Sequence, residues 1–221
     1  MNSTDKDAIH FYHGGRDWVG PFEVNPKNSK VMEHGPGLYL TNGIETARHY
    51  AKGGGIVQAI GIDPNAKRLS VVKCKIDNLI GFVSSNGVRA GKAVIADLDW
   101  CTDGMASDHL GLEYLINLMI NHKALTPSVA PKLNAFIVEQ GADLDVFTAP
   151  MFASAGATTD QWVVVFNPDV VVSRVRVDMK AYDWSETHLP TFEEQLAGLS
   201  HAQEDDPLAH GVQGRELSLE S

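Results

Sequence analysis

One histidine and two tyrosines are the residues of this chain whose types and spacing best suit chemistry. His13 precedes Gly14 and Gly15, Tyr39 follows a Gly-Pro-Gly segment, and Tyr50 lies eleven residues after Tyr39. A phenol ring is a flat surface on which a planar ligand can stack, with a gain of about 0.5–1.5 kcal/mol per ring. Gly14 lacks a side chain, so a polar group can reach its backbone N–H and C=O. These residues could therefore hold a planar ring together with a polar substituent.

A fourth segment follows much later, where Asp160, Gln161 and Trp162 open an apolar run of valines. The amide of Gln161 can accept a hydrogen bond, but it is neutral, so it cannot deprotonate a poor nucleophile or supply a full negative charge. Asp160 could take the role of Gln161 only if the strand shifted by one residue, because alternate strand residues point to opposite faces. The segment therefore offers one polar side chain to each face of the predicted strand.

Short strands near both ends of the chain are expected to position the four segments. The apolar runs that predict them lie at residues 8–13, 38–40, 56–62, 143–148, 161–166 and 170–178. Thr41 and Asn42 are N-cap candidates for a helix over residues 44–52, which would carry Tyr50. Long loops are predicted between these elements, at residues 16–36 and 149–160.

The middle of the chain favours helices. Residues 110–124 have apolar side chains at helical spacing, and residues 129–140 predict a second helix. Residues 70–75 alternate as a half-buried strand does, whereas residues 82–99 fit more than one kind of element. Near the end, the sequence predicts a short helix over residues 190–199, followed by a polar, mobile tail.

In this order the four segments resemble the nicotinamide pocket of the ADP-ribosyltransferase superfamily, in its His-Tyr-Glu branch, which includes diphtheria toxin and the poly(ADP-ribose) polymerases. In that branch a strand ends in a His-Gly pair, as at His13-Gly14. A Gly-x-Gly-Leu-Tyr strand then precedes a helix with a second tyrosine eleven residues on, as at Tyr39 and Tyr50. The resemblance covers residues 8–178 and implies an α+β fold, a split β-sandwich of two antiparallel sheets with flanking helices.

The implied catalytic domain spans residues 1–184 and has a helical insertion near residues 105–140. Residues 185–221 would follow it as a short helix and a mobile acidic tail. Such a domain would be an NAD-dependent mono-ADP-ribosyltransferase, which moves ADP-ribose from NAD to a macromolecular acceptor and releases nicotinamide. No metal is implied.

The resemblance also assigns roles to individual residues. The catalytic residues would be His13, Tyr39 and Gln161. The residues that would bind NAD are His13, Gly14, Tyr39, Thr41 and Tyr50. The two tyrosines would sandwich the nicotinamide, Gly14 would bond its carboxamide, and His13 would donate to an adenosine-ribose hydroxyl.

Three positions depart from the family pattern. Gln161 stands where the branch has a Glu, Ala47 where the polymerases have a Ser, and Thr159 where arginine-modifying relatives have a Glu. The first departure implies loss of poly(ADP-ribose) elongation, which leaves single transfer, NAD cleavage or a catalytically silent NAD/ADP-ribose-binding module. The third disfavours arginine as the acceptor. A structural or interaction domain, in which His13 and the tyrosines are only packed, is a further alternative.

The overall charge bears on the acceptor and on the compartment. The chain has 18 Lys and Arg against 28 Asp and Glu, a formal net charge of −10. Nonspecific binding to polyanions is therefore disfavoured, and a protein acceptor is slightly favoured over nucleic acid. Without an export signal or a long apolar stretch, we expect no membrane contact and a cytoplasmic protein. The resemblance adds the alternative of a toxin or effector delivered into a target cell.

Overall fold

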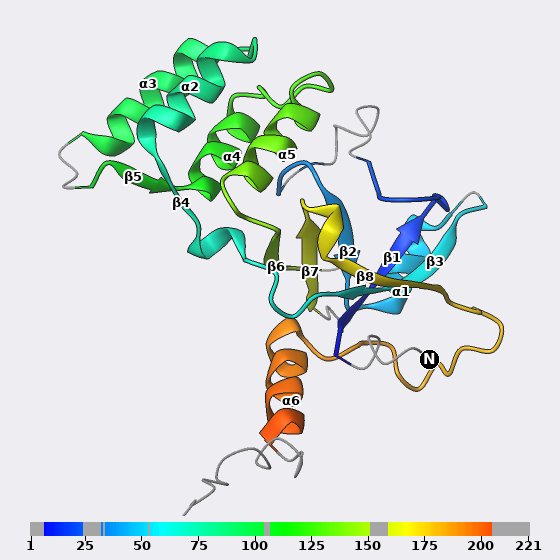
Figure 1. The fold of residues 1–221 in the computed structure, drawn as a ribbon. Coiled ribbons are helices and arrows are strands. Elements are labelled where there is room, and N and C mark those ends of the chain that lie inside the picture. The colour runs from blue at the N-terminus through cyan, green and yellow to red at the C-terminus, as the bar shows by residue number, and fades with distance from the viewer. Residues whose placement is uncertain are drawn as a thin grey trace, which may run out of the picture.

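The computed structural model describes residues 7–23, 32, 34–52, 54–103, 107–150 and 159–204 of the chain. Within them, six strands form one antiparallel sheet in the order β6-β7-β2-β1-β3-β8 (Figure 1). These strands are β1 (Ile9–Gly15), β2 (Leu38–Thr41), β3 (Ile56–Ile62), β6 (Leu144–Pro150), β7 (Thr159–Val165) and β8 (Val171–Arg176). A second sheet pairs β4 (Lys73–Lys75) with β5 (His109–Gly111). The expected α+β class is confirmed.

Six α-helices accompany the sheets in this part of the chain. They are α1 (Ile44–Tyr50), α2 (Ile76–Ser85), α3 (Gly91–Thr102), α4 (Leu112–Asn121), α5 (Ala130–Glu139) and α6 (Phe192–Glu204). Figure 1 shows α2 to α5 gathered with β4 and β5 on the β6 side of the large sheet, and we call this group the helical unit. The helix α6 lies apart from it, below the sheet in the same view.

The helical unit is larger than the sequence predicted. It begins with α2 at Ile76 rather than near residue 105, and the ambiguous residues 82–99 belong to α2 and α3. Residues 70–75, expected to form one strand, divide between a 3-10 turn (Leu69–Val71) and β4. The apolar side of this alternating pattern packs against the helices, because Cys74 of β4 is buried in the core of the helical unit and β4 does not join the large sheet.

The expected pair of facing sheets is not seen in the described residues. All the longer strands join one sheet, and the two-stranded sheet lies among the helices (Figure 1). Each face of the large sheet is instead covered by helices. Instead of the split β-sandwich expected from the resemblance, the described residues form one six-stranded sheet with helices on both faces.

Side chains alternate between the two faces of this sheet, because successive strand residues point in opposite directions. One face, which we call the α6 face, packs around Phe192 of α6 with Ile9, Phe11, Leu38, Leu40, Val163 and Val165. The opposite face, which we call the α1 face, includes Tyr12, Tyr39 and Val164 and packs against α1 and the helical unit. Paired residues on neighbouring strands share a face, as Tyr39 and Val164 do.

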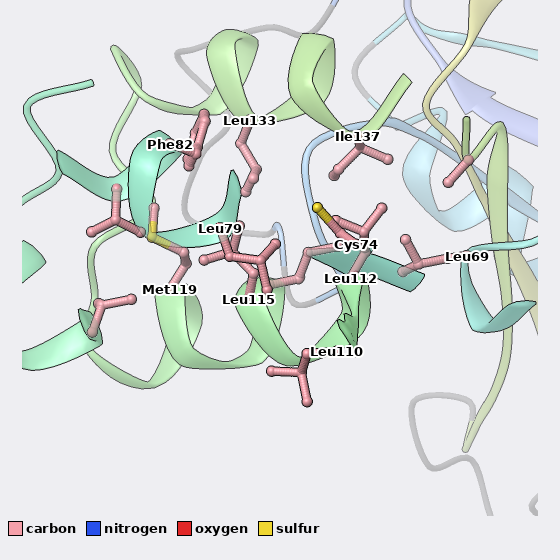
Figure 2. Packing of buried hydrophobic residues seen from close by; sticks show 14 of the residues in the cluster. Leu69, Cys74, Leu79, Phe82, Leu110, Leu112, Leu115, Met119, Leu133 and Ile137 are labelled. Atoms are coloured by element: carbon pink, nitrogen blue, oxygen red, sulfur yellow. The ribbon is translucent and has the colours of Figure 1, made fainter. Parts of the chain in front are cut away.

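The helical unit has a core of its own, shown in Figure 2. Leu79 and Phe82 of α2 pack there with Leu115 of α4, and each is at most 6% exposed. Burial of such a side chain is worth about 1.5–3 kcal/mol. Val164 and Phe166, from the end of β7, belong to the same cluster. The helical unit is therefore joined to the α1 face of the large sheet by shared packing.

The helix α6 is part of the fold rather than an appendage. Its first residue, Phe192, is 1% exposed in the core of the α6 face. Gln195 acts as both donor and acceptor to the backbone of His10 in β1, at 2.9 and 2.7 Å. The helix expected over residues 190–199 is thus confirmed in kind, although it is longer than expected. The tail expected to be mobile lies largely outside the described residues, which end at residue 204.

Candidate functional site

Three of the predicted site residues, His13, Gly14 and Tyr39, lie where β1 and β2 separate. The two strands pair only at Tyr12 and Thr41, whereas β1 pairs with β3 along its full length to Gly15. Beyond Tyr12, the edge of β1 that faces β2 therefore has no strand partner among the described residues. Continuing the register places Gly14 opposite Tyr39 across this opening, which we call the β1–β2 split.

His13 spans the β1–β2 split. Its Nδ1 donates to the carbonyl oxygen of Tyr39 at 3.0 Å, and its ring meets that of Trp18 edge to face. Burial lowers the pKa of His13 below 6.5, against the opposing effect of the Tyr39 hydrogen bond, so the imidazole is neutral at pH 7. A neutral ring that donates from Nδ1 has a lone pair at Nε2. His13 can therefore accept a hydrogen bond from a ligand hydroxyl, where the sequence predicted that it would donate one.

Gly14 is packed directly beneath α1. A β-carbon built on Gly14 would lie 1.6 Å from the carbonyl oxygen of Ala47, which no other residue type could tolerate. The glycine is thus required by the approach of α1 to β1. That approach fixes α1, and with it Tyr50 at its last turn, relative to the β1–β2 split.

The two predicted tyrosines both belong to the α1 face side of the molecule but differ in exposure. The hydroxyl of Tyr39 donates to the Gly35 carbonyl at 2.8 Å and accepts from the His34 N–H at 3.1 Å. Its ring packs against the helical core, so Tyr39 organises the segment before β2. Tyr50 is 42% exposed and meets the ring of Trp162 edge to face at 5.8 Å. Tyr50 therefore offers the more accessible ring for stacking.

Gln161 is placed away from the tyrosines. It lies on the α6 face, 9% exposed, and its Nε2 donates to Glu193 Oε2 at 2.8 Å while its Oε1 accepts the Phe192 N–H. Burial raises the pKa of Glu193, but hydrogen bonding from Gln161 and the charge of Arg68 outweigh it and leave the pKa below its ordinary value. Both ends of the Gln161 amide are thus engaged by the start of α6. The structure does not bring its side chain together with Tyr39 and Tyr50.

Asp160 is the carboxylate that shares the α1 face with Tyr39. It is fully buried, and its two oxygens accept from Thr41 Oγ1 and from His188 Nε2, each at 3.0 Å. The Thr41 hydroxyl also accepts the Gly43 N–H at 3.1 Å. Thr41, predicted to bind NAD, is therefore committed to a network that joins β2, β7 and the chain before α6.

Trp162 is a candidate that the sequence analysis did not single out. It lies on the α1 face next to Tyr50, and its indole Nε1 is buried without a hydrogen-bond partner in the described part of the chain. Phe147 is nearly parallel to it at 6.4 Å, and His34 stacks on Phe147 at 3.4 Å. The signal was present, because strand alternation from Gln161 places Trp162 on the opposite face. A ligand stacked on Tyr50 would meet this aromatic row.

Comparisons with known proteins do not assign the chain to a family. No family model matches it, and neither the curated proteins nor the solved structures include a significant match. Among the described helices, none combines the length and apolar character needed to cross a bilayer. The described residues also contain no group of three or more His, Cys, Asp or Glu side chains arranged to hold a metal ion.

Proposed function

We propose that this chain is an NAD-dependent mono-ADP-ribosyltransferase, which transfers one ADP-ribose from NAD to a macromolecular acceptor and releases nicotinamide. The observation that carries the proposal is the β1–β2 split, where Gly14 lies opposite Tyr39 on an edge without a strand partner in the described residues, and His13 bridges the two strands. Tyr50 supplies an exposed ring at the end of α1, the helix that packs on Gly14. An ADP-ribosyltransferase-like fold is part of this proposal.

The proposed mechanism assigns a binding task to each of these residues. The backbone N–H and C=O of Gly14 hydrogen-bond the nicotinamide carboxamide, and the Tyr50 ring stacks on the pyridinium. The Nε2 atom of His13 accepts from a ribose hydroxyl. The bond between the ribose C1′ and the pyridinium nitrogen breaks, and its electron pair leaves with nicotinamide. The acceptor's nucleophile then bonds to C1′ and releases its proton to water. The protein lowers the barrier to this transfer by holding the dinucleotide oriented and partly desolvated.

A catalytically silent NAD or ADP-ribose-binding module is the second candidate. One observation favours it: the Gln161 amide is fully engaged by Phe192 and Glu193 on the α6 face. The nearby carboxylate, Asp160, is buried and bound to Thr41 and His188. A cationic transition state in the β1–β2 split would then lack a carboxylate from β7 that is free to face it, which slows transfer without preventing NAD binding.

The test compares NAD binding with nicotinamide release in matched variants. Tyr50→Ala removes the exposed ring at the end of α1, and Tyr114→Ala removes a comparably exposed ring on α4. We expect nicotinamide release to fall about tenfold or more in Tyr50→Ala, because a stacked ring contributes about 1 kcal/mol and also orients the bond that breaks. Tyr114→Ala should match the unmodified protein. Binding without release would support the silent module, and the absence of both would contradict the two candidates together.

The acceptor and the biological setting are also part of the proposal. A protein acceptor is favoured over nucleic acid because the formal net charge of −10 repels polyanions over the surface as a whole. The role of a toxin or effector delivered into a target cell rests on the resemblance described above, and the alternative is a cytoplasmic enzyme. Mass spectrometry of modified acceptors decides between these kinds of target.

A further inference from the structure

An open groove of about 750 Å³ lies between the end of α1, the start of β3 and the end of β8. Its floor is apolar, since Val57 and Val177 belong to the small core that α1 forms with the sheet. Neither His13 nor Gly14 nor the two predicted tyrosines lines it. The groove is therefore separate from the β1–β2 split and needs its own explanation.

Four cationic residues line this groove, which we call the basic groove. They are Arg48, Lys52, Arg176 and Lys180, and Asp178 is the one carboxylate among the lining residues. No ion pair joins any of the four to a carboxylate in the described part of the chain. All four residues are exposed, so their charges give the groove a local positive potential on a protein whose formal net charge is −10.

Two of the cations are held by side chains that are not carboxylates. The Arg48 guanidinium lies over the Trp184 ring at 5.3 Å, and Lys52 donates to His49 Nδ1 at 2.9 Å. The turn that carries Lys180 is shaped by Asp178, whose Oδ1 accepts the Lys180 backbone N–H at 3.0 Å. The contacts with Trp184 and His49 restrict two of the cationic side chains without forming an ion pair. Preorganised charges of this kind bind an anion with a smaller loss of entropy.

We infer that the basic groove binds a ligand that carries two or more phosphate groups. Guanidinium groups match phosphate oxygens in a forked arrangement, and ammonium groups add compact positive charge. The groove volume falls within the range of about 300–1,000 Å³ that is usual for small-molecule sites, so a diphosphate with an attached nucleoside would fit. This site goes beyond the proposed transferase activity and does not depend on it.

The test measures pyrophosphate and ADP binding by calorimetry at fixed ionic strength. The double variant Lys52→Gln/Lys180→Gln removes two charges from exposed positions of the groove. Its control is Arg174→Gln. Arg174 lies on the same strand as Arg176, but its guanidinium lies over the Trp18 ring and does not line the groove. We expect the double variant to weaken pyrophosphate binding about tenfold or more and the control to stay within about twofold. Tighter binding of ADP would identify a nucleotide as the source of the phosphates, and equal binding an inorganic one.

Two outcomes would overturn the inference. They are absence of binding by both probes and equal weakening in the Arg174→Gln control. If NAD displaces pyrophosphate and loses affinity in parallel in the double variant, the inference is supported, with the NAD diphosphate as the ligand of the basic groove. Conversely, if NAD does not bind at all, the proposed function is contradicted. Pyrophosphate binding would still test the inference about the basic groove.

Discussion

His13 shows how one buried side chain links stability to pH. Because burial lowers its pKa below 6.5, the unfolded chain takes up a proton at this residue at a higher pH than the folded protein does. Stability therefore rises with pH between the two pKa values and is lost as the pH falls below about 6.5. The neutral ring with its Nδ1–H bonded to Tyr39 is the form that the fold selects.

This predicts a difference in pH dependence between the protein and His13→Gln. On acidification from about pH 7.5 to about pH 5, the unmodified protein should lose more unfolding free energy than the variant, whose side chain does not titrate. Urea denaturation at several pH values measures both slopes. Equal slopes would show that the pKa of His13 is the same in the folded and unfolded states.

Gly14 gives a second prediction at the scale of a residue. Gly14→Ala would set a β-carbon against the Ala47 carbonyl, at 1.6 Å in the present backbone, so α1 must move. We expect a loss of about 1–3 kcal/mol of unfolding free energy, as for an overpacked core. Gly81→Ala is the matched control, because that glycine lies within α2 with open space around it. It should gain about 0.5–1 kcal/mol, and a stable Gly14→Ala would contradict the close packing of α1.

The sequence was informative about individual site residues where local chemistry decided their place. The His-Gly pair and Tyr39 could be located because strand ends and turns are set by nearby residues. The position of Gln161 could not, because its amide is bound by residues about thirty positions later in α6. Contacts of that separation leave no periodic signal in the sequence. Trp162 was named only as part of the segment, because its role depends on Tyr50 and Phe147, which lie far from it in the sequence.

At the scale of elements, Gln161 acts in the structure as a hydrogen-bonding partner for the start of α6. Gln161→Glu would remove the donor to Glu193 and place a second carboxylate beside it. We expect a loss of about 1–3 kcal/mol of unfolding free energy, because the site is buried and the new charge is unpaired. The same change would favour NAD hydrolysis only if this side chain faced the β1–β2 split.

The second half of this cycle tests the contact itself. Glu193→Gln alone should cost little, because it removes one exposed ion pair with Arg68. Combined with Gln161→Glu it restores a donor facing an acceptor, so the double variant should be more stable than Gln161→Glu alone. Denaturant unfolding of the four proteins gives the coupling free energy. Strictly additive effects would contradict the contact between β7 and α6.

Most strands and helices could be predicted because their signals are local. The strand at Ile56–Ile62 was recognised from its apolar and β-branched residues, and the helix at Ala130–Glu139 from its spacing. The beginning of the helical unit was not, because residues 82–99 include the end of α2, a connection and most of α3, so no single periodicity describes them. The division of residues 70–75 likewise depends on Cys74 entering that distant core.

At the scale of the whole molecule, charge is distributed unevenly. Acidic residues outnumber basic residues in the chain, 28 to 18, yet four cationic residues line the basic groove at the end of α1, the helix that also carries Tyr50. Because the protein is negative overall, the basic groove should select anions by their shape and by the spacing of their charges, not by long-range attraction. The core of the helical unit, which includes Val164 and Phe166 from the end of β7, joins that unit to the α1 face, where the proposed NAD chemistry would occur.

The most direct measurement follows labelled NAD. The protein is incubated with NAD labelled in both the nicotinamide and the adenosine moieties, together with a cell lysate as the source of acceptors. The transferase account predicts that the molar amount of free labelled nicotinamide equals that of the ADP-ribose bound to acceptors. Mass spectrometry should show one ADP-ribose at each modified site. Intact NAD and no labelled macromolecule, with folded protein present throughout, would contradict it.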